Sequence, residues 1–385
     1  MKQLNVLHLS SLGIWDIEKG KGRMSTYLPL KGEITHGHNV TFISCHDTVK
    51  NEDYEGIICK KINIPFSHSR AIVRLLALPL TDLIFFIDGY KLARKSKPDV
   101  IYSHCTFSVF PAYLLAKIFK SKFVIRMYGS GTSAFSKKKY PSYLLRKRCL
   151  KHKADAYILA NDGTASDRLA MRFGVPKEKI HFLINGIKKD VQITRDEDLL
   201  REVAPNGEKI IIVLGRLANW KRVDMAISMM KKLNKKVKSK LLIVGDGPEM
   251  TSLESLAKDL NVSDSIFFAG SKNRQEIFRY LCISDVFLSM NEQTSMTNTT
   301  YEAMICGVPV VVRNRGTSSD LITNNINGIL IDDSEIINLP NIISNLLNNE
   351  TTRRRIGKNG RDYIYKNWPT WEERVEQEMN IIENL

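Results

Sequence analysis

The feature that most constrains this chain is a regular alternation between short apolar runs and longer stretches with helical periodicity. Such alternation is typical of α/β folds in which helices cover both faces of a mostly parallel sheet. Seven strands are expected in the first half of the chain and six in the second. Their ranges are 5–9, 39–44, 56–62, 99–103, 122–127, 155–160 and 179–184, followed by 209–214, 240–244, 265–269, 285–289, 309–313 and 328–332.

The helical stretches carry one apolar face each. Ala226, Met229, Met230 and Leu233 recur at i, i+3, i+4 and i+7, the spacing of a stripe that packs against a core. Between the two sets of strands the sequence turns polar and loses this period. We therefore expect two doubly wound, Rossmann-like domains at 1–190 and 209–365, joined by a linker at 191–208. Such sheets bind ligands beyond the carboxyl ends of their strands.

Positive charge is concentrated in the first domain. The chain has a formal net charge of +16, and residues 1–190 hold 32 Lys and Arg against 15 Asp and Glu, whereas residues 191–385 hold 25 against 26. A basic run is usually only a solvated face. The alternative is an anionic partner, either a phospholipid surface or a phosphate-bearing substrate. Nucleic acid is not expected, because no recognition motif with interleaved aromatic residues accompanies the charge.

One stretch of the basic domain mixes charged with apolar side chains. Residues 70–87 (RAIVRLLALPLTDLIFFI) predict either an interfacial helix or a core helix broken at Pro79, and membrane contact is slightly favoured. No run approaches the roughly 18 apolar residues of a membrane span, and a signal peptide is not expected. The six cysteines lie far apart without zinc spacing, so free thiols in a reducing cytosol are expected.

Two loops in the second domain follow predicted strands directly. In the first, a strand ends at Gly215, the loop carries Arg216 and Lys221, and an amphipathic helix begins directly afterwards. A helix N-terminus presents free N–H groups and a partial positive charge, and two cations beside it can hold a diphosphate. The simpler alternative is that both side chains are only solvated. The second loop, 245–248 (GDGP), is a tight turn that requires no function beyond its geometry.

A third loop carries the strongest signal. Residues 290–298 are polar and lead into a helix that opens near Thr299 and carries Glu302. Hydroxyls and free amides converge at such a helix start, where a phosphate can bind. A carboxylate in the first helical turn can accept hydrogen bonds from sugar hydroxyls. Alternatively, Glu302 only complements the helix dipole.

With these loops identified, an ordered set of segments resembles the retaining glycosyltransferases of family 4 (glycosyltransferase group 1), whose GT-B fold has two facing Rossmann-like domains. The resemblance covers nearly the whole chain. Its segments are GHNVTFIS (37–44), PDVIYSH (98–104), ADAYILANDGTASDRL (154–169), FGVPKEKIHFLINGI (173–187), GRLANWK (215–221), GDGPE (245–249), IFFAG (266–270), YEAMICGVPVVV (301–312) and NWPTWEERV (367–375). It implies that residues 366–385 form a helix that crosses back to the first domain.

The resemblance also assigns site residues. It implies that Arg216 and Lys221 hold the donor's diphosphate and that Glu302 holds the nucleotide ribose, these three forming the catalytic set. The other implied donor-binding positions are Gly22 and Gly215 in their loops, the backbone from Ser271 to Asn273 against the base, and the backbone amides of Asn298 and Thr299 against phosphate.

One donor-site position departs from the family pattern. The family commonly has two glutamates with seven residues between them, but Thr294 stands eight positions before Glu302, and Glu292 lies two residues too far away. Thr294, with the backbone of Ser295 and Met296, is therefore expected to replace the missing glutamate in contacts with the donor sugar.

A second departure lies in the first domain. Many family members have His-Gly after a strand of that domain, where this chain has Tyr128-Gly129. Any role of that histidine on the acceptor or transition-state side therefore passes to Tyr128 or is lost. His104, at the end of another strand, is the possible substitute.

The resemblance implies transfer of a hexose-type sugar, with retention of configuration, from a nucleoside-diphosphate sugar to an acceptor hydroxyl. No cofactor or metal is expected, since the single D-x-D sequence of the chain, Asp196-Glu197-Asp198, lies in the predicted linker. The basic first domain favours a lipid-linked glycan of surface polysaccharide (O-antigen or capsule type) as acceptor, and a cytoplasmic enzyme at the inner face of the cell membrane. A GT-B-fold sugar-nucleotide epimerase and a non-catalytic sugar-nucleotide binder are the alternatives.

Overall fold

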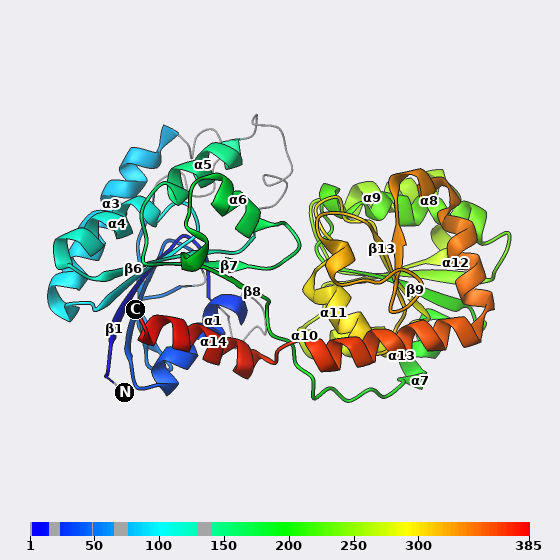
Figure 1. Ribbon diagram of the computed structural model, residues 1–385. Coiled ribbons are helices and arrows are strands. Elements are labelled where there is room, and N and C mark those ends of the chain that lie inside the picture. The colour runs from blue at the N-terminus through cyan, green and yellow to red at the C-terminus, as the bar shows by residue number, and fades with distance from the viewer. Residues whose placement is uncertain (1, 15–23, 48, 65–75, 130–140) are drawn as a thin grey trace. The chain divides into compact units, whose positions relative to one another are not determined.

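The computed structural model describes residues 2–14, 24–47, 49–64, 76–129 and 141–385, which form two compact units (Figure 1). The first unit comprises Met1–Asn161, Ala165–Gly186 and Trp371–Leu385. The second comprises Asp162–Thr164 and Ile187–Thr370. Each unit has its own sheet and its own hydrophobic core.

An eight-stranded sheet lies at the centre of the first unit, in the order β3-β4-β2-β1-β5-β6-β7-β8. All neighbouring strands are parallel except β3 and β4. The strands are β1 Asn5–Ser10, β2 Asn39–Ser44, β3 Glu52–Tyr54, β4 Ile57–Lys61, β5 Val100–His104, β6 Lys122–Met127, β7 Ala156–Ala160 and β8 Ile180–Leu183. Most of their side chains are buried, as expected of strands covered on both faces.

Helices cover both faces of this sheet (Figure 1). On one face, Leu7 and Leu9 of β1 pack with apolar side chains from α3 to α6; on the other, Val6 packs with α14. This division follows the alternation of side chains along a strand. The helices are α1 Met24–Thr35, α3 Leu78–Ser96, α4 Val109–Phe119, α5 Pro141–Leu150, α6 Ser166–Arg172, the 3-10 helix η2 Lys177–Lys179, and α14 Trp371–Glu383.

The second unit has a six-stranded, fully parallel sheet in the order β11-β10-β9-β12-β13-β14. Its strands are β9 Lys209–Leu214, β10 Ser239–Val244, β11 Ile266–Gly270, β12 Val286–Ser289, β13 Val310–Arg313 and β14 Ile329–Ile331. The predicted stripe of Ala226, Met229, Met230 and Leu233 is buried in the main core of this unit.

The helices of the second unit fill the connections between its strands. They are α7 Glu197–Val203, α8 Val223–Leu233, α9 Met250–Asp259, α10 Arg274–Cys282, α11 Asn298–Ile305, α12 Leu339–Asn348 and α13 Glu350–Asn367, with the 3-10 helices η3 Asn219–Lys221, η4 Ser263–Ser265, η5 Ser318–Asp320 and η6 Asp333–Asn338. Helices α8, α9 and α12 pack on one face of the sheet.

The predicted architecture of two doubly wound α/β units is confirmed, and all thirteen predicted strands are present within two residues of their expected bounds. The sequence pattern missed β3, a three-residue edge strand of sequence EDY that pairs antiparallel with β4 and has no apolar alternation. The polar stretch at 191–208 contains α7, and the division between the units lies at Gly186–Ile187. The last helix, α14, returns to the first unit.

The prediction that Pro79 breaks a helix within residues 70–87 is wrong. Helix α3 begins at Leu78, and Pro79 lies in its first turn, where a missing N–H group costs nothing. Proline therefore starts this helix and does not interrupt it. Residues 65–75 lie outside the described residues.

Candidate functional site

The proposed donor-binding residues follow strands of the second unit that end at one edge of its parallel sheet. Arg216 and Lys221 follow β9, and Asn273 follows β11. The loop after β12 contacts the loop after β9, because the Glu292 amide donates to the Trp220 carbonyl at 2.9 Å. The neighbouring strands β9 and β12 therefore bring two of the three loops side by side.

Glycines allow the loops after β9 and β10 to approach closely. Gly245 has φ +148°, and a Cβ there would lie 1.9 Å from the carbonyl oxygen of Gly215. A Cβ on Gly247 would lie 2.2 Å from the Leu217 carbonyl oxygen. The GDGP turn is thus explained by backbone packing beneath the loop that carries Arg216.

Two of the three basic side chains in the β9 loop have no partner among the described residues. Arg216 is exposed, Lys221 is half-buried, and neither side chain forms a hydrogen bond or ion pair with the described part of the chain. Arg222, in contrast, donates to Asp224 at 2.9 Å and to Glu292 at 2.8 Å. Arg222 is therefore neutralised within the loop, while Arg216 and Lys221 are available to an anion.

Lys221 lies directly against Gly215. Its Nζ would be 3.8 Å from a Cβ on Gly215, a residue with φ +135°. Burial lowers the pKa of Lys221, because the charged ammonium has lost hydration without gaining a carboxylate. A bound anion would restore the missing interaction and favour the charged form.

The start of α11 supplies free backbone donors at the same edge. Thr297 is the N-cap residue, with extended backbone angles, and its side chain makes no capping hydrogen bond. No described residue accepts a hydrogen bond from the amides of Asn298 and Thr299, whereas the Thr300 and Tyr301 amides donate to the Thr297 carbonyl. Two free amides at a helix N-terminus form a suitable phosphate contact.

Thr294, Ser295 and Met296 are buried and engaged within their own loop. Thr294 Oγ1 accepts from the Met296 amide at 3.0 Å. The Ser295 amide donates to Ser318 Oγ at 3.0 Å, and its hydroxyl donates to the Arg313 carbonyl at 2.8 Å. The Thr294 hydroxyl has a proton and a second lone pair that no described residue uses, so it is the group of this loop that can contact a donor sugar without rearrangement.

Glu302 is buried on α11 and forms an ion pair with Arg274, with 3.0 Å between Oε1 and Nη2. Burial raises the pKa of Glu302, and the Arg274 guanidinium opposes this shift. The second carboxylate oxygen has no partner among the described residues and can accept from a hydroxyl.

Arg274 was not identified from the sequence. It is the first residue of α10, directly after the N-cap Asn273, whose side chain accepts from the Gln275 and Glu276 amides at 3.0 Å. The capping-box pattern of Asn273 and Glu276 could have predicted from the sequence that Arg274 lies in a first helical turn, beside the predicted base-binding segment. Its distant partner had no sequence signal.

The acceptor-side residues lie at the corresponding edge of the first unit. His104 ends β5 and is buried, and Tyr128 follows β6. The Tyr128 hydroxyl lies 2.7 Å from His104 Nδ1, so the structure joins both candidates in one hydrogen bond. Gly129 has φ +89°, and its carbonyl accepts a hydrogen bond from Arg146. Gly22 lies outside the described residues.

Three further observations concern the described part of the chain as a whole. All six cysteines are free thiols. No three His, Cys, Asp or Glu side chains among these residues are grouped so that they could hold a metal ion. Within the same ranges, no helix has the length and hydropathy that crossing a bilayer requires.

Two family models match consecutive parts of the sequence. Residues 33–191 match the model described as Glycosyltransferase Family 4, and residues 194–363 match the model described as Glycosyl transferases group 1. The two matches agree in order with the segments that carried the resemblance.

Among curated relatives, N-acetyl-alpha-D-glucosaminyl L-malate synthase of Bacillus anthracis is 29% identical over 193 residues, 50% of this chain and 50% of its own. A GDP-mannose-dependent alpha-(1-6)-phosphatidylinositol monomannoside mannosyltransferase of Mycolicibacterium smegmatis is 27% identical over 228 residues, 56% of this chain and 59% of its own. The chain thus matches little more than half the length of these relatives.

Solved structures with a similar fold match this chain along its whole length. A glycosyltransferase from Rickettsia africae has a TM-score of 0.75 at 17% identity and covers 100% of this chain and 99% of its own. Anabaena HepE, solved with UDP and glucose, has a TM-score of 0.76 at 16% identity and covers 100% of both chains. These likenesses show the GT-B fold. The two family models, which together span most of the sequence, show that the chain belongs to the group 1 glycosyltransferases of family 4.

Proposed function

We propose that this protein transfers a hexose-type sugar, with retention of anomeric configuration, from a nucleoside-diphosphate sugar to an acceptor hydroxyl. The proposal is carried by one observation: at one sheet edge, two cations and the amides at the start of α11 have no partner among the described residues. The cations are Arg216 and Lys221. Glu302, held by Arg274, is the proposed contact for the ribose hydroxyls.

The chemistry explains why such a site needs cations. As the bond between the anomeric carbon and the diphosphate oxygen breaks, the electron pair leaves with the oxygen and negative charge builds on the diphosphate. Preorganised cations and helix-terminal amides stabilise that charge without reorganising at the moment of reaction. We propose that Arg216, Lys221 and the amides of Asn298 and Thr299 perform this role without a metal ion or other cofactor.

The relatives support a nucleotide-sugar donor without selecting one. HepE was solved with UDP and glucose, and the Mycolicibacterium relative is named for its use of GDP-mannose. UDP-sugars and GDP-mannose are therefore the first donors to test.

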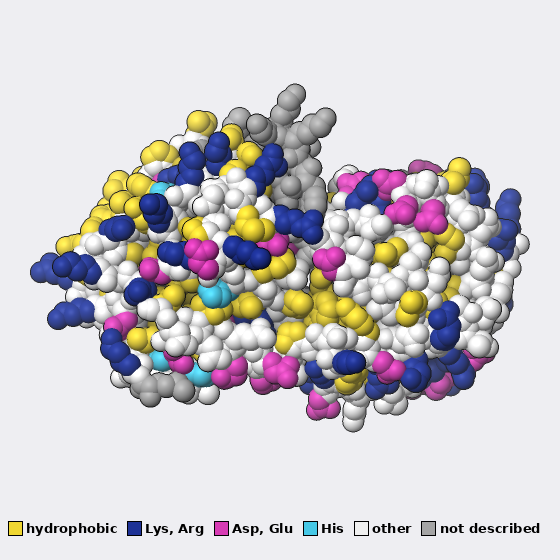
Figure 2. Space-filling model, viewed as in Figure 1, with side chains coloured by type: hydrophobic (Ala, Val, Ile, Leu, Met, Phe, Trp, Pro, Cys, Tyr) yellow, Lys and Arg dark blue, Asp and Glu magenta, His cyan; other side chains and the backbone are white. Residues whose placement is uncertain are grey.

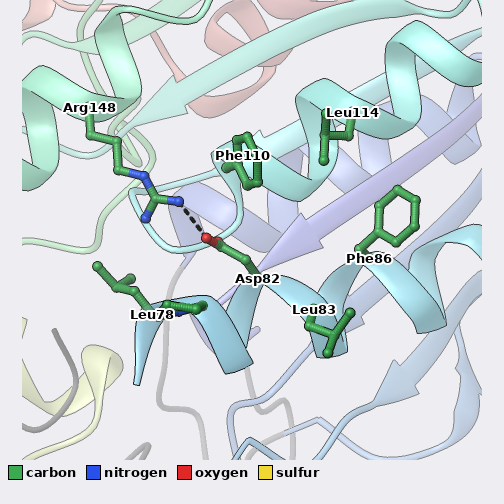
Figure 3. Close-up of a pocket in the computed structure, with 8 residues that line it drawn as sticks. Leu78, Asp82, Leu83, Phe86, Phe110, Leu114 and Arg148 are labelled. Carbon is green, nitrogen blue, oxygen red and sulfur yellow. Dashed lines mark hydrogen bonds and ion pairs between the residues drawn. The ribbon is translucent and has the colours of Figure 1, made fainter. Parts of the chain in front are cut away.

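For the acceptor we propose a lipid-linked glycan of surface polysaccharide synthesis, with the enzyme peripheral on the inner face of the cell membrane. The support is an apolar groove of about 690 Å³ between α3, α4 and α5 (Figure 3). An Arg148–Asp82 ion pair lies at one end. The groove is lined by Leu78, Pro79, Asp82, Leu83, Phe86, Phe110, Leu114 and Arg148.

The surface around this groove combines apolar and basic side chains. Leu80 and Leu83 are 43% and 52% exposed. Figure 2 shows hydrophobic side chains gathered over this side of the first unit, with Lys and Arg side chains next to them. Such a surface suits an anionic bilayer, where apolar contacts and positive charge act together.

The donor part of the proposal is tested by thermal unfolding with UDP, GDP, ADP and their sugars. A ligand at about 100 times its Kd adds about 2.7 kcal/mol to the free energy of unfolding, so one nucleotide series should raise the Tm clearly. The anomeric configuration of the product, read by NMR, then tests retention. Conversion of the donor alone into an epimeric sugar nucleotide would overturn the transferase assignment in favour of an epimerase.

The membrane part is tested by flotation with phosphatidylglycerol vesicles. Binding should weaken as salt rises, because exposed charges are screened. Leu83→Glu should reduce binding, whereas Ile326→Glu, at a 53% exposed isoleucine of the second unit, should not. Salt-independent binding, or equal loss in both variants, would contradict this part.

A further inference from the structure

Arg222 lies directly after Lys221 in the loop after β9, and its backbone is in the left-handed conformation, with φ 52° and ψ 44°. This conformation favours glycine and is tolerated by asparagine, whereas a longer side chain is strained there. The other described non-glycine residues of the second unit with positive φ are asparagines, Asn261 and Asn325. The turn alone does not require an arginine, and the contacts of the side chain show what it adds.

The Arg222 guanidinium binds two carboxylates. Its Nε and Nη2 donate to the two oxygens of Asp224 at 3.0 and 2.9 Å, the paired arrangement that a guanidinium and a carboxylate favour. Its Nη1 donates to Glu292 Oε1 at 2.8 Å. Asp224 belongs to the first turn of α8 and Glu292 to the loop after β12, so one side chain compensates acids from two segments.

The contacts of Glu292 lie on both sides of Lys221 in the sequence. The Glu292 amide donates to the carbonyl of Trp220, the residue before Lys221, at 2.9 Å, and the Glu292 side chain pairs with Arg222, the residue after it. A carboxylate is thereby fixed beside the loop that is proposed to hold the diphosphate. Without compensation, the charge of this carboxylate would repel an anion bound at Lys221.

Two more arginines extend this group of charges. Arg313, at the end of β13, is buried and lies 3.9 Å from Glu292 and 2.9 Å from Asp333. Arg315 pairs with the other oxygen of Asp333. We define the charge cluster as Arg222, Arg313, Arg315, Asp224, Glu292 and Asp333. Its three arginines balance its three carboxylates, so the cluster does not offset the two cations of the proposed donor site.

We propose that Arg222 cancels the charges of Asp224 and Glu292 beside the diphosphate site, so that Lys221 binds the anion with its full charge. Arg222 is in this sense a positioning residue, because it acts through its neighbours and does not touch the nucleotide. The inference rests on the proposed function, which supplies the diphosphate. Loss of Arg222 would leave the charge cluster with one net negative charge.

Two measurable properties distinguish this electrostatic effect from a loss of loop structure. Repulsion costs more affinity for a ligand with more negative charge, and a nucleoside diphosphate carries more charge than its sugar nucleotide, because its terminal phosphate is free. Salt screens the repulsion, since the Debye length falls from about 10 Å at 0.1 M to about 3 Å at 1 M. A distorted loop would instead weaken both ligands alike at either salt concentration.

The test is Arg222→Gly, which removes the guanidinium and suits the left-handed backbone. Calorimetry with UDP, UDP-glucose, GDP and GDP-mannose first identifies the nucleotide pair that the wild-type protein binds. At low salt we expect Arg222→Gly to weaken binding of the sugar nucleotide about 5-fold and of the nucleoside diphosphate about 10-fold. At about 1 M salt, both losses should shrink to less than about twofold.

Charge rescue separates compensation from shape. Adding Glu292→Gln to Arg222→Gly makes the charge cluster neutral again without restoring a contact, so the affinity should return to within about twofold of wild type. Glu292→Gln alone should tighten nucleoside-diphosphate binding. Arg222→Lys keeps the charge in a different shape and should bind within about twofold of wild type. The backbone control is Asn261→Gly, at an exposed residue with φ 53°, which should bind as wild type.

The outcomes separate the two proposals. Wild-type affinity in Arg222→Gly, equal losses that persist at high salt, or no rescue by Glu292→Gln overturns the role of Arg222 and leaves the proposed function standing. Should the wild-type protein bind none of the four nucleotides, the proposed function falls and this inference falls with it. If Arg222→Gly does not fold, Glu292→Gln alone decides: tighter binding supports charge compensation, and unchanged or weaker binding contradicts it.

Discussion

At the sheet edge of the second unit, Arg216 and Lys221 have no partner within the described chain, whereas at the corresponding edge of the first unit hydrogen bonds join Glu33, His8, His104 and Tyr128. The two units have the same kind of parallel sheet. They differ at their edges: one has basic side chains without partners among the described residues, and the other has polar side chains joined by hydrogen bonds.

The net charges of the two halves would by themselves suggest an anion site in the first half. Residues 1–190 carry the basic excess, whereas residues 191–385 hold 25 Lys and Arg against 26 Asp and Glu. The proposed anion site nevertheless lies in the balanced half, because Arg222 is neutralised by Asp224 and Glu292 while Lys221 is not. The proposal therefore rests on basic side chains without partners among the described residues, not on the total charge of a domain.

The largest expected effect is a loss of stability in the first unit that leaves the proposed donor site unchanged. Glu378→Ala leaves Arg126 and Arg374 buried without a carboxylate, and loss of one partner from a buried ion pair costs about 3–5 kcal/mol. Chemical denaturation should show this loss in the free energy of unfolding. Glu376→Ala, at a side chain that is 59% exposed, should change it by less than about 0.5 kcal/mol. Equal values for the two variants would contradict the importance of this network.

In the second unit we expect substitutions to lower activity and to leave stability nearly unchanged. Lys221→Ala and Arg216→Ala should each lower sugar transfer by about 10²–10³-fold, because each removes one charged contact to the leaving diphosphate. Stability should change little, since neither side chain has a partner among the described residues. Initial rates and thermal unfolding, with Lys232→Ala as an exposed-lysine control, measure both quantities. Retention of wild-type transfer would show that the diphosphate lies elsewhere.

A smaller effect is expected on nucleotide affinity when one backbone amide of α11 is removed and the basic side chains are kept. Asn298→Pro removes the first amide of α11, and it fits because Thr297 has φ −119° and ψ 156°. Loss of one charge-assisted hydrogen bond is worth about 1.5–3 kcal/mol, or about 10–100-fold in nucleotide affinity. Asn298→Ala keeps the amide and should bind as wild type. Calorimetric Kd values that do not separate these variants would remove the amide from the phosphate contact.

The smallest effect concerns pH. Because burial lowers the pKa of Lys221, its ammonium loses its proton at a lower pH than an ordinary lysine. Nucleoside-diphosphate affinity should therefore fall as pH rises from neutrality through this lowered pKa, by at most about tenfold per pH unit, with proton uptake on binding above it. Lys221→Arg keeps its charge and should flatten the profile. An identical fall in both proteins would assign it to another group.

Sequence analysis predicted more of the fold than of the contacts. Thirteen strands were predicted because buried parallel strands are continuous apolar runs, whereas β3 was missed because an exposed edge strand needs no such run. Arg216 and Lys221 were predicted from their loop after a strand and Glu302 from its place in a first helical turn, and the family resemblance implied their roles, which stay predictions. Arg274 was missed because its pairing with Glu302 joins two helices, and such a contact leaves no periodic signal.

The sequence by itself determined the alternation of strands and helices, the two units and the loops that carry Arg216 and Lys221, since these depend on local periodicity and on residues next to strand ends. The tertiary structure alone decided which cations are neutralised and which stay open, and it joined Glu33, His8, His104 and Tyr128 from four separate segments. The physical reason is that hydrogen bonding and burial depend on the packing of distant segments, which no local pattern encodes.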